Sequence, residues 1–182
     1  MRAHGRPAAR RRRVARRVRR VLGRAAGRPD RLSEGEPVTI PLTLQLKRHV
    51  PAAPERVWRA WTDPAELARW YWPASFQTTC DVDLRVGGRF RIASATAAMA
   101  VSGEFAAVEP PPAGRLVHTW RWDGEEVETL VTVEFLAGAD GGTDVVVTHE
   151  RFTDAGDCAN HAQGWTDCLA RLIAHDFAPP DR

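Results

Sequence analysis

The 182-residue chain has little cysteine, and its three thiols are widely spaced. Cys80, Cys158 and Cys168 are too few for the disulfide framework of a small secreted domain. Cys158 and Cys168 fall in a segment with helical periodicity, where a rise of about 15 Å would separate them and prevent a bridge. We therefore expect reduced thiols and a cytoplasmic protein.

The chain also lacks the motifs of several enzyme classes and any run of eighteen apolar residues, so no transmembrane helix is predicted. Gly87 and Gly88 precede an alternating segment, not the helix that a phosphate-binding loop requires. No serine stands in a G-x-S-x-G motif. Asp157, Cys158 and His161 share a helical turn but have no second Cys/His pair at ligand spacing, so we expect no metal and no cofactor.

Acidic residues are almost absent from the first 31 positions. This segment holds thirteen arginines and one acid, a net charge of +12, whereas residues 32–182 hold thirteen basic and twenty-two acidic residues, a net charge of −9. Residues 1–36 are expected to form a disordered, Arg-rich extension, because like charges repel along any helix there. Weak contact with nucleic acid or an anionic membrane, or a role as an organelle transit peptide, are open alternatives.

Residues 38–178 carry clear structural periodicity and are expected to form one domain. Alternation predicts a first strand over 40–50 and six further strands between residues 80 and 149, separated by Gly and Pro turns. Two short helices are predicted to start at Pro54 and at Asp63-Pro64. A long amphipathic helix is predicted over 156–177. Strands segregated from helices indicate an α+β fold, with a seven-stranded antiparallel sheet curved around the C-terminal helix.

Aromatic residues are plentiful, with seven tryptophans in the chain. A twisted sheet and one helix do not touch everywhere, so inward-facing rings either form a solid core or line a pocket. Gly103, between two inward-facing apolar residues, indicates a bend or a close approach of another backbone. The candidate ligand-binding residues are Trp61, Trp70, Phe90, Phe105, His118, Trp120, Trp122, His161, Trp165 and Leu169.

Three histidines fall on faces predicted to point inward: His118, His149 and His161. A histidine in an apolar cavity titrates in the range that suits a general acid or base. His161 is the first catalytic candidate, because it lies one helical turn before Trp165, and His149 is the second. The alternative is that each ring packs and makes one hydrogen bond, so whether the protein is an enzyme stays open.

Short segments spread over residues 42–177 carry a family resemblance. They are Pro54–Trp58, Trp61–Pro64, Gly87–Phe90, Gly103–Phe105, Arg115–Val117, Trp120 with Trp122, and Gly164-Trp165. In this order they resemble the START-like (SRPBCC) superfamily, and within it the homologues of the heat-shock-protein-90 ATPase activator. The resemblance implies a helix-grip fold around an apolar cavity, and it implies no fixed chemistry.

The sequence therefore predicts a soluble START-like domain that binds a small hydrophobic or aromatic ligand between the sheet and the C-terminal helix. Two alternatives stay open. One is a cyclase-like or hydrolase-like enzyme in which a cavity histidine acts as acid or base. The other, which the resemblance implies, is a protein that interacts with a chaperone ATPase.

Overall fold

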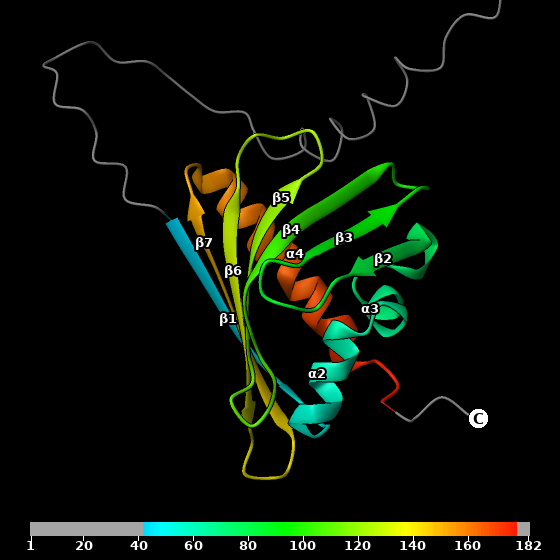
Figure 1. Ribbon diagram of the computed structural model, residues 1–182, viewed down its shortest axis with the longest axis vertical. Coiled ribbons are helices and arrows are strands. Elements are labelled where there is room, and N and C mark those ends of the chain that lie inside the picture. The colour runs from blue at the N-terminus through cyan, green and yellow to red at the C-terminus, as the bar shows by residue number, and fades with distance from the viewer. Residues whose placement is uncertain (1–41, 178–182) are drawn as a thin grey trace, which may run out of the picture. The chain divides into compact units, whose positions relative to one another are not determined.

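The computed structural model describes residues 42–177 (Figure 1). The predicted extension over 1–36 and the domain limits at 38 and 178 lie outside this range. The elements in chain order are β1 (Leu42–Val50), α2 (Pro54–Thr62), α3 (Pro64–Trp70), η1 (Ala74–Phe76), β2 (Thr78–Val82), β3 (Arg89–Ser94), β4 (Met99–Glu109), β5 (Arg115–Trp122), β6 (Thr129–Ala137), β7 (Thr143–Phe152) and α4 (Ala155–Ile173). None of the helices in this part of the chain has the length and apolar character needed to cross a bilayer.

The seven strands form one antiparallel sheet in the order β1-β7-β6-β5-β4-β3-β2, with β1 and β2 outermost. Figure 1 shows α4 running diagonally across the sheet, with α2 and α3 beside its C-terminal half. The predicted α+β fold, with its seven antiparallel strands, two short helices after the first strand and a long C-terminal helix, is confirmed.

The two short helices start where the sequence indicates. Each has proline in its first turn, where the missing N–H costs nothing. Asp63 ends α2 and caps α3, because its carboxylate accepts hydrogen bonds from the backbone N–H groups of Ala65 and Glu66 at 2.9 and 3.1 Å. Trp61 at the end of α2 and Trp70 at the end of α3 are both buried in the core.

Several element limits differ from those that the sequence predicts. Alternation over 80–86 predicts a strand to Val86, but β2 ends at Val82, because residues 83–88 form turns in which Arg85 N–H donates to the carbonyl of Asp83 and Gly88 N–H to that of Arg85. Alternation also predicts a strand from Val127, but β6 begins at Thr129 and Val127 is exposed. α4 ends at Ile173, and the chain then reaches α2, where Arg56 Nε donates to the carbonyl of Phe177 at 2.8 Å.

Gly103 confirms the close approach that the sequence indicates. A Cβ atom at this position would lie 1.9 Å from the carbonyl oxygen of Thr119 on β5 and 2.6 Å from the ring of Phe90 on β3. The absence of a side chain therefore lets β3, β4 and β5 come together with the Phe90 ring beneath them.

Candidate functional site

The interior contains a cavity of about 20 Å³ between the short helices, the sheet and α4. It is lined by Trp61, Thr62, Leu67, Tyr71, Val82, Phe90, Ile92, Phe105, Leu116, His118 and Trp165. None of these side chains carries a full charge at neutral pH. A volume of this size holds one water molecule, so the aromatic rings largely fill the space that the sequence predicted for a pocket.

Five of the ten predicted ligand-binding residues line this cavity: Trp61, Phe90, Phe105, His118 and Trp165. The other five lie outside this lining. Trp70 donates its indole N–H to the carbonyl of Ala60 at 2.9 Å, which holds α3 against α2. Trp120, Trp122 and His161 cluster toward the N-terminal half of α4, with Trp120 and His161 ring centroids 4.8 Å apart. Leu169 is fully buried in the core.

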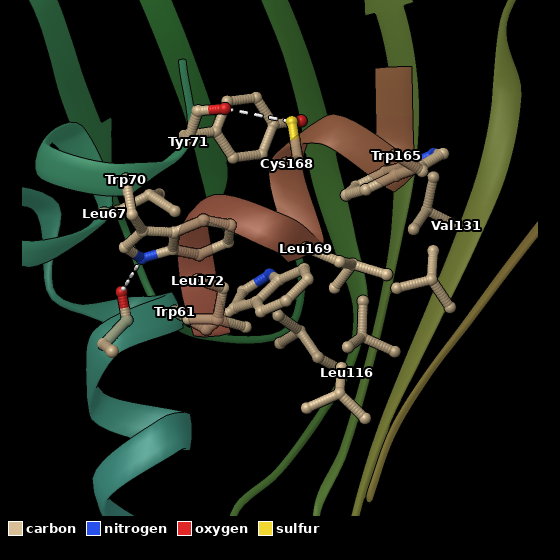
Figure 2. Close-up of a cluster of buried hydrophobic side chains, with 14 of the residues drawn as sticks. Trp61, Leu67, Trp70, Tyr71, Leu116, Val131, Trp165, Cys168, Leu169 and Leu172 are labelled. Carbon is tan, nitrogen blue, oxygen red and sulfur yellow. Dashed lines mark hydrogen bonds between the residues drawn. The ribbon is translucent and has the colours of Figure 1, made fainter. Parts of the chain in front are cut away.

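The short helices contribute cavity residues that were not predicted: Thr62, Leu67 and Tyr71. Leu67 and Tyr71 are four residues apart, a helical spacing that places both on one face. The backbone of Tyr71 is anchored to α4 by two hydrogen bonds. Its carbonyl accepts from the Cys168 thiol and from Arg171 Nη2, each at 2.9 Å. Figure 2 shows Tyr71 and Cys168 meeting where α3 contacts α4, with Trp61, Leu169 and Leu116 below them.

His118 on β5 is the histidine that lines the cavity. Its Nδ1 lies 2.9 Å from the carbonyl oxygen of Thr119, so Nδ1 carries the proton and donates it. Nε2 then presents a lone pair, and it makes no hydrogen bond to any residue within 42–177. The ring is packed edge-on against Phe90 and Phe105, at centroid distances of 4.7 and 5.9 Å. Burial lowers the pKa of His118 to about 4, so the ring is neutral at physiological pH.

His149 on β7 has the opposite tautomer, and both its nitrogens are engaged. Trp165 donates its indole N–H to Nδ1 at 3.0 Å, so Nε2 carries the proton and donates to Thr129 Oγ1 at 2.6 Å. Thr129 in turn donates to the carbonyl of Trp120 at 2.9 Å. Burial lowers the pKa of His149 to about 2. This chain of hydrogen bonds leaves His149 no free position for proton transfer.

His161 on α4 keeps one nitrogen free. Its Nδ1 donates to the carbonyl of Asp157 at 2.7 Å, one turn earlier in the helix. Its Nε2 is buried and has no hydrogen-bond partner in the described residues. Burial lowers the pKa of His161 below its ordinary value. The ring contacts Trp120, His149 and Phe152, and it lies outside the cavity lining.

The loop over residues 83–88 adjoins the cavity, because Val82 and Phe90 at its two ends both line it. The loop is held to β4 by hydrogen bonds from Gly87 N–H to the carbonyl of Phe105 and from Phe105 N–H to the carbonyl of Gly88. Its tip exposes two aliphatic side chains, Leu84 and Val86, with Val86 63% accessible. The cavity therefore has apolar, exposed side chains next to it.

A second hollow, a groove of about 380 Å³, lies on the outer face of the sheet. Its charged lining consists of Asp81, Arg89, Arg91, Glu104, Arg121 and Glu128. Arg91 pairs with Asp123 at 2.7 Å and Arg89 with Glu104 at 3.7 Å. The balance of acids and bases gives this groove no preference for one sign of charge. Within residues 42–177, no three His, Cys, Asp or Glu side chains are placed to hold a metal ion.

Comparison with solved structures finds the same fold in other proteins. Protein CV1439 from Chromobacterium violaceum is 31% identical and matches 72% of this chain and 94% of its own, with a TM-score of 0.60. CalU16 from Micromonospora echinospora is 27% identical over 76% of each chain, with a TM-score of 0.58. PFC0360w, an HSP90 activator from Plasmodium falciparum, is 23% identical over 72% of this chain and 94% of its own, with a TM-score of 0.60, which shows the fold alone.

No curated protein matches the chain significantly. The family model described as "Activator of Hsp90 ATPase homolog 1-like protein" matches residues 51–175, which include α2, α3, the sheet from β2 to β7 and all of α4. The chain therefore belongs to the Activator of Hsp90 ATPase homolog 1-like family of the START-like superfamily.

Proposed function

We propose that the domain binds a small aromatic or apolar ligand at the cavity beneath α2 and α3. The observation that carries this proposal is the lining itself. Aromatic and aliphatic side chains from the short helices, four strands and α4 converge there, together with a few neutral polar groups, among them His118 and the hydroxyls of Thr62 and Tyr71. Ligand pockets typically combine an apolar wall with a few polar groups that fix orientation.

Binding requires the cavity to open. A ligand the size of benzene occupies a cavity of about 150 Å³, compared with the 20 Å³ found here. The loop over residues 83–88 is the segment best placed to move, because it carries no core side chain of its own. Outward movement of Val82 and Phe90 would enlarge the cavity, and Leu84 and Val86 would then cover the ligand. The ligand surface so buried would contribute about 25 cal/mol per Å².

A thermal-shift series with toluene, p-cresol and naphthalene tests this proposal, since a ligand that binds only the folded state raises Tm with its concentration. Val82→Trp fills the cavity and is expected to abolish the shift. Leu136→Trp, on an exposed position of β6, is the matched control and is expected to keep it. The proposal is wrong if no ligand shifts the wild-type protein, or if the Val82 variant responds as strongly as the wild type.

Acid–base catalysis is the second candidate, and the buried, unpartnered Nε2 of His161 favours it. The hydrogen bond from Nδ1 to Asp157 fixes the tautomer in which Nε2 accepts a proton. Turnover of any substrate should be lost in His161→Gln with little change in Tm. Turnover that survives this substitution would remove His161 from catalysis.

Family membership supports a third reading, interaction with a chaperone ATPase. We also propose a cytoplasmic location, which agrees with the three free thiols of Cys80, Cys158 and Cys168.

Weak contact of residues 1–36 with nucleic acid or an anionic membrane is a separate proposal. Retention on heparin that falls with salt and disappears when residues 1–36 are deleted would support it, and equal retention of the shortened protein would exclude it.

A further inference from the structure

The chain that follows α4 packs against α2 and α3, and we call its residues 174–177 the C-terminal strap (Figure 1). Arg56 on α2 holds the strap in two ways. Its Nε donates to the carbonyl of Phe177 at 2.8 Å, and its guanidinium carbon lies 5.4 Å from the centroid of the Phe177 ring. The ring of His175 packs edge-on against Phe177, with centroids 5.2 Å apart. The strap therefore connects the end of α4 to the first turn of α2.

His175 is a buried titratable group that no part of the proposed function uses. Its side chain is only 7% exposed, and its Nε2 has no hydrogen-bond partner among residues 42–177. Oε2 of Glu66 on α3 lies 3.8 Å from Nε2, which is beyond hydrogen-bond distance. Burial lowers the pKa of His175 below its ordinary value, and the charges of Arg56 and Arg69 also lower it, against the opposing effect of Glu66. The neutral ring is therefore the form that the closed strap accommodates.

Glu66 has little capacity left to stabilise a protonated His175. Arg56 donates from Nη1 to Oε2 of this carboxylate, and Arg59 Nε pairs with Oε1 at 3.1 Å. Together with Arg69, whose charge also acts on the ring, three guanidinium groups share one carboxylate, a net charge of +2. A proton on His175 would raise this charge to +3 in a place where little water screens it.

The strap avoids this charge if it leaves the helices. In a detached strap the His175 ring lies in water, where its pKa returns to about 6.5. Asp176, the acid of the strap itself, has an exposed side chain, so solvent screens its charge. Because the detached form binds a proton more tightly than the closed form, the ratio of detached to closed strap increases as the pH falls below 6.5. The increase is at most about tenfold per pH unit for one proton.

We propose that protonation of His175 releases the C-terminal strap from α2 and α3 while the rest of the domain stays folded. The arrangement acts as a conformational switch that responds to mild acid. Release removes the contacts of the strap with two helices whose side chains, among them Trp61 and Tyr71, line the cavity. The inference goes beyond the proposed function and does not require a ligand.

NMR of the full chain between pH 7.5 and pH 5 tests the switch. The ¹H–¹⁵N NOE of residues 174–177 reports the mobility of their backbone, and the Arg56 Nε proton reports its bond to Phe177. On acidification the NOE values of the strap are expected to fall and the Arg56 Nε proton to move upfield, whereas the amide signals of β6 stay in place. The imidazole of His175 is expected to titrate with a pKa below 6.5.

Three variants separate the effect of His175 from other effects of acid. His175→Gln is neutral at every pH and is expected to keep the strap ordered throughout. His175→Lys carries a positive charge and is expected to release the strap at pH 7.5, so this comparison does not depend on the stability of the domain in acid. His49→Gln removes a histidine of β1 that is 43% exposed. It is the matched control and is expected to release the strap over the same pH range as the wild type.

Several outcomes overturn the inference. They are a strap that stays ordered while His175 becomes protonated, release that persists in His175→Gln, and a strap as ordered in His175→Lys as in the wild type. A pKa of His175 above 6.5 has the same weight, because Glu66 would then bind the proton and strengthen the contact. Each of these outcomes leaves the proposed ligand binding standing, since the thermal-shift series tests that separately.

Discussion

Thr129 is a small residue on which several buried polar groups depend. Its hydroxyl accepts from His149 Nε2 at 2.6 Å and donates to the carbonyl of Trp120 at 2.9 Å. The same histidine accepts from the indole of Trp165, so the network joins β5, β6, β7 and α4. Each group is satisfied because the next one is in place, which makes the network sensitive to any single loss.

Thr129→Val is expected to lower the free energy of unfolding by about 2–3 kcal/mol. The substitution keeps the shape but leaves a buried histidine N–H and a buried carbonyl without partners. Urea denaturation measures the effect. Thr132→Val, on the same strand with its side chain on the outer face, is the control and should change stability by less than about 0.5 kcal/mol. Similar losses in the two variants would contradict this account.

Sequence patterns predict the direction of these side chains but not their partners. Strand alternation places His118 and His149 on inward faces, and both are buried. The pairing of His149 with Trp165 depends on how α4 crosses β7, a tertiary feature without a local signal. For the same reason the sequence did not indicate that both nitrogens of His149 are engaged whereas His161 keeps an unpartnered Nε2.

At the scale of elements, the end of α3 is capped by a residue from α4 about one hundred positions later. Arg171 donates from Nε to the carbonyl of Trp70 at 3.0 Å and from Nη2 to that of Tyr71 at 2.9 Å. The last carbonyls of a helix have no partner within it, so these bonds satisfy them and anchor α3 to α4. The cavity wall that α3 provides is held in position by this contact.

Arg171→Met is expected to destabilise the domain by about 1.5–3 kcal/mol, because it removes charged hydrogen bonds but keeps the aliphatic stem. The thiol of Cys168, which donates to the same carbonyl of Tyr71 and is buried, should react faster with a thiol reagent as α3 loosens. Arg69→Met, an exposed change on α3, is the control for lost charge. Unchanged thiol reactivity in the Arg171 variant would show that the cap does not hold the two helices together.

Two glycines in different elements are predicted to respond oppositely to alanine. Gly103→Ala should lower stability by about 1–3 kcal/mol, since its Cβ would meet the backbone of Thr119 at 1.9 Å and neither strand has room to yield. Gly164→Ala should raise stability by about 0.5–1 kcal/mol, since this helical glycine has open space around it. Thermal unfolding of both variants checks the signs, and a neutral Gly103 variant would be inconsistent with the close approach of β4 and β5.

At the scale of the whole molecule, buried histidines link stability to pH. Burial lowers the pKa of His118 to about 4 and that of His149 to about 2, whereas the ordinary value is 6.5. The unfolded chain therefore binds more protons as the pH falls below 6.5, and the folded state loses stability. His49 has the opposite sign, because its hydrogen bond to Asp144 raises its pKa, but it lies on the surface and contributes little.

The free energy of unfolding is accordingly expected to fall between pH 6.5 and pH 4.5. Each buried histidine contributes a slope of up to about 1.4 kcal/mol per pH unit. Urea denaturation at pH 7, 6 and 5 measures the slope, and His118→Phe should reduce it by up to about 1.4 kcal/mol per pH unit whatever its stability at pH 7. A stability that stays level across this range would mean that the two rings are protonated without unfolding.

The sequence predicted the helices and strands of the domain better than it predicted how the side chains pack in the interior. Alternation, proline positions and helical spacing are local signals, and they located the strands of the sheet and all three α-helices. The volume left inside depends on how rings from distant elements pack, as when Trp61 on α2 stacks on Trp165 of α4 at 6.2 Å. No local pattern indicated that the cavity would be so small, although helical spacing does place Tyr71 on the same face as Leu67.

The two edge strands of the sheet affect whether molecules of this protein associate with one another. In the described part of the chain, β1 and β2 each present one row of backbone groups that no neighbouring strand engages. Such rows invite edge-to-edge association and fibre growth. Here β2 is only five residues long and carries Asp81, while β1 carries Lys47 and Arg48. The short length of β2 and the charged residues on β1 and β2 therefore disfavour pairing between the sheets of two molecules.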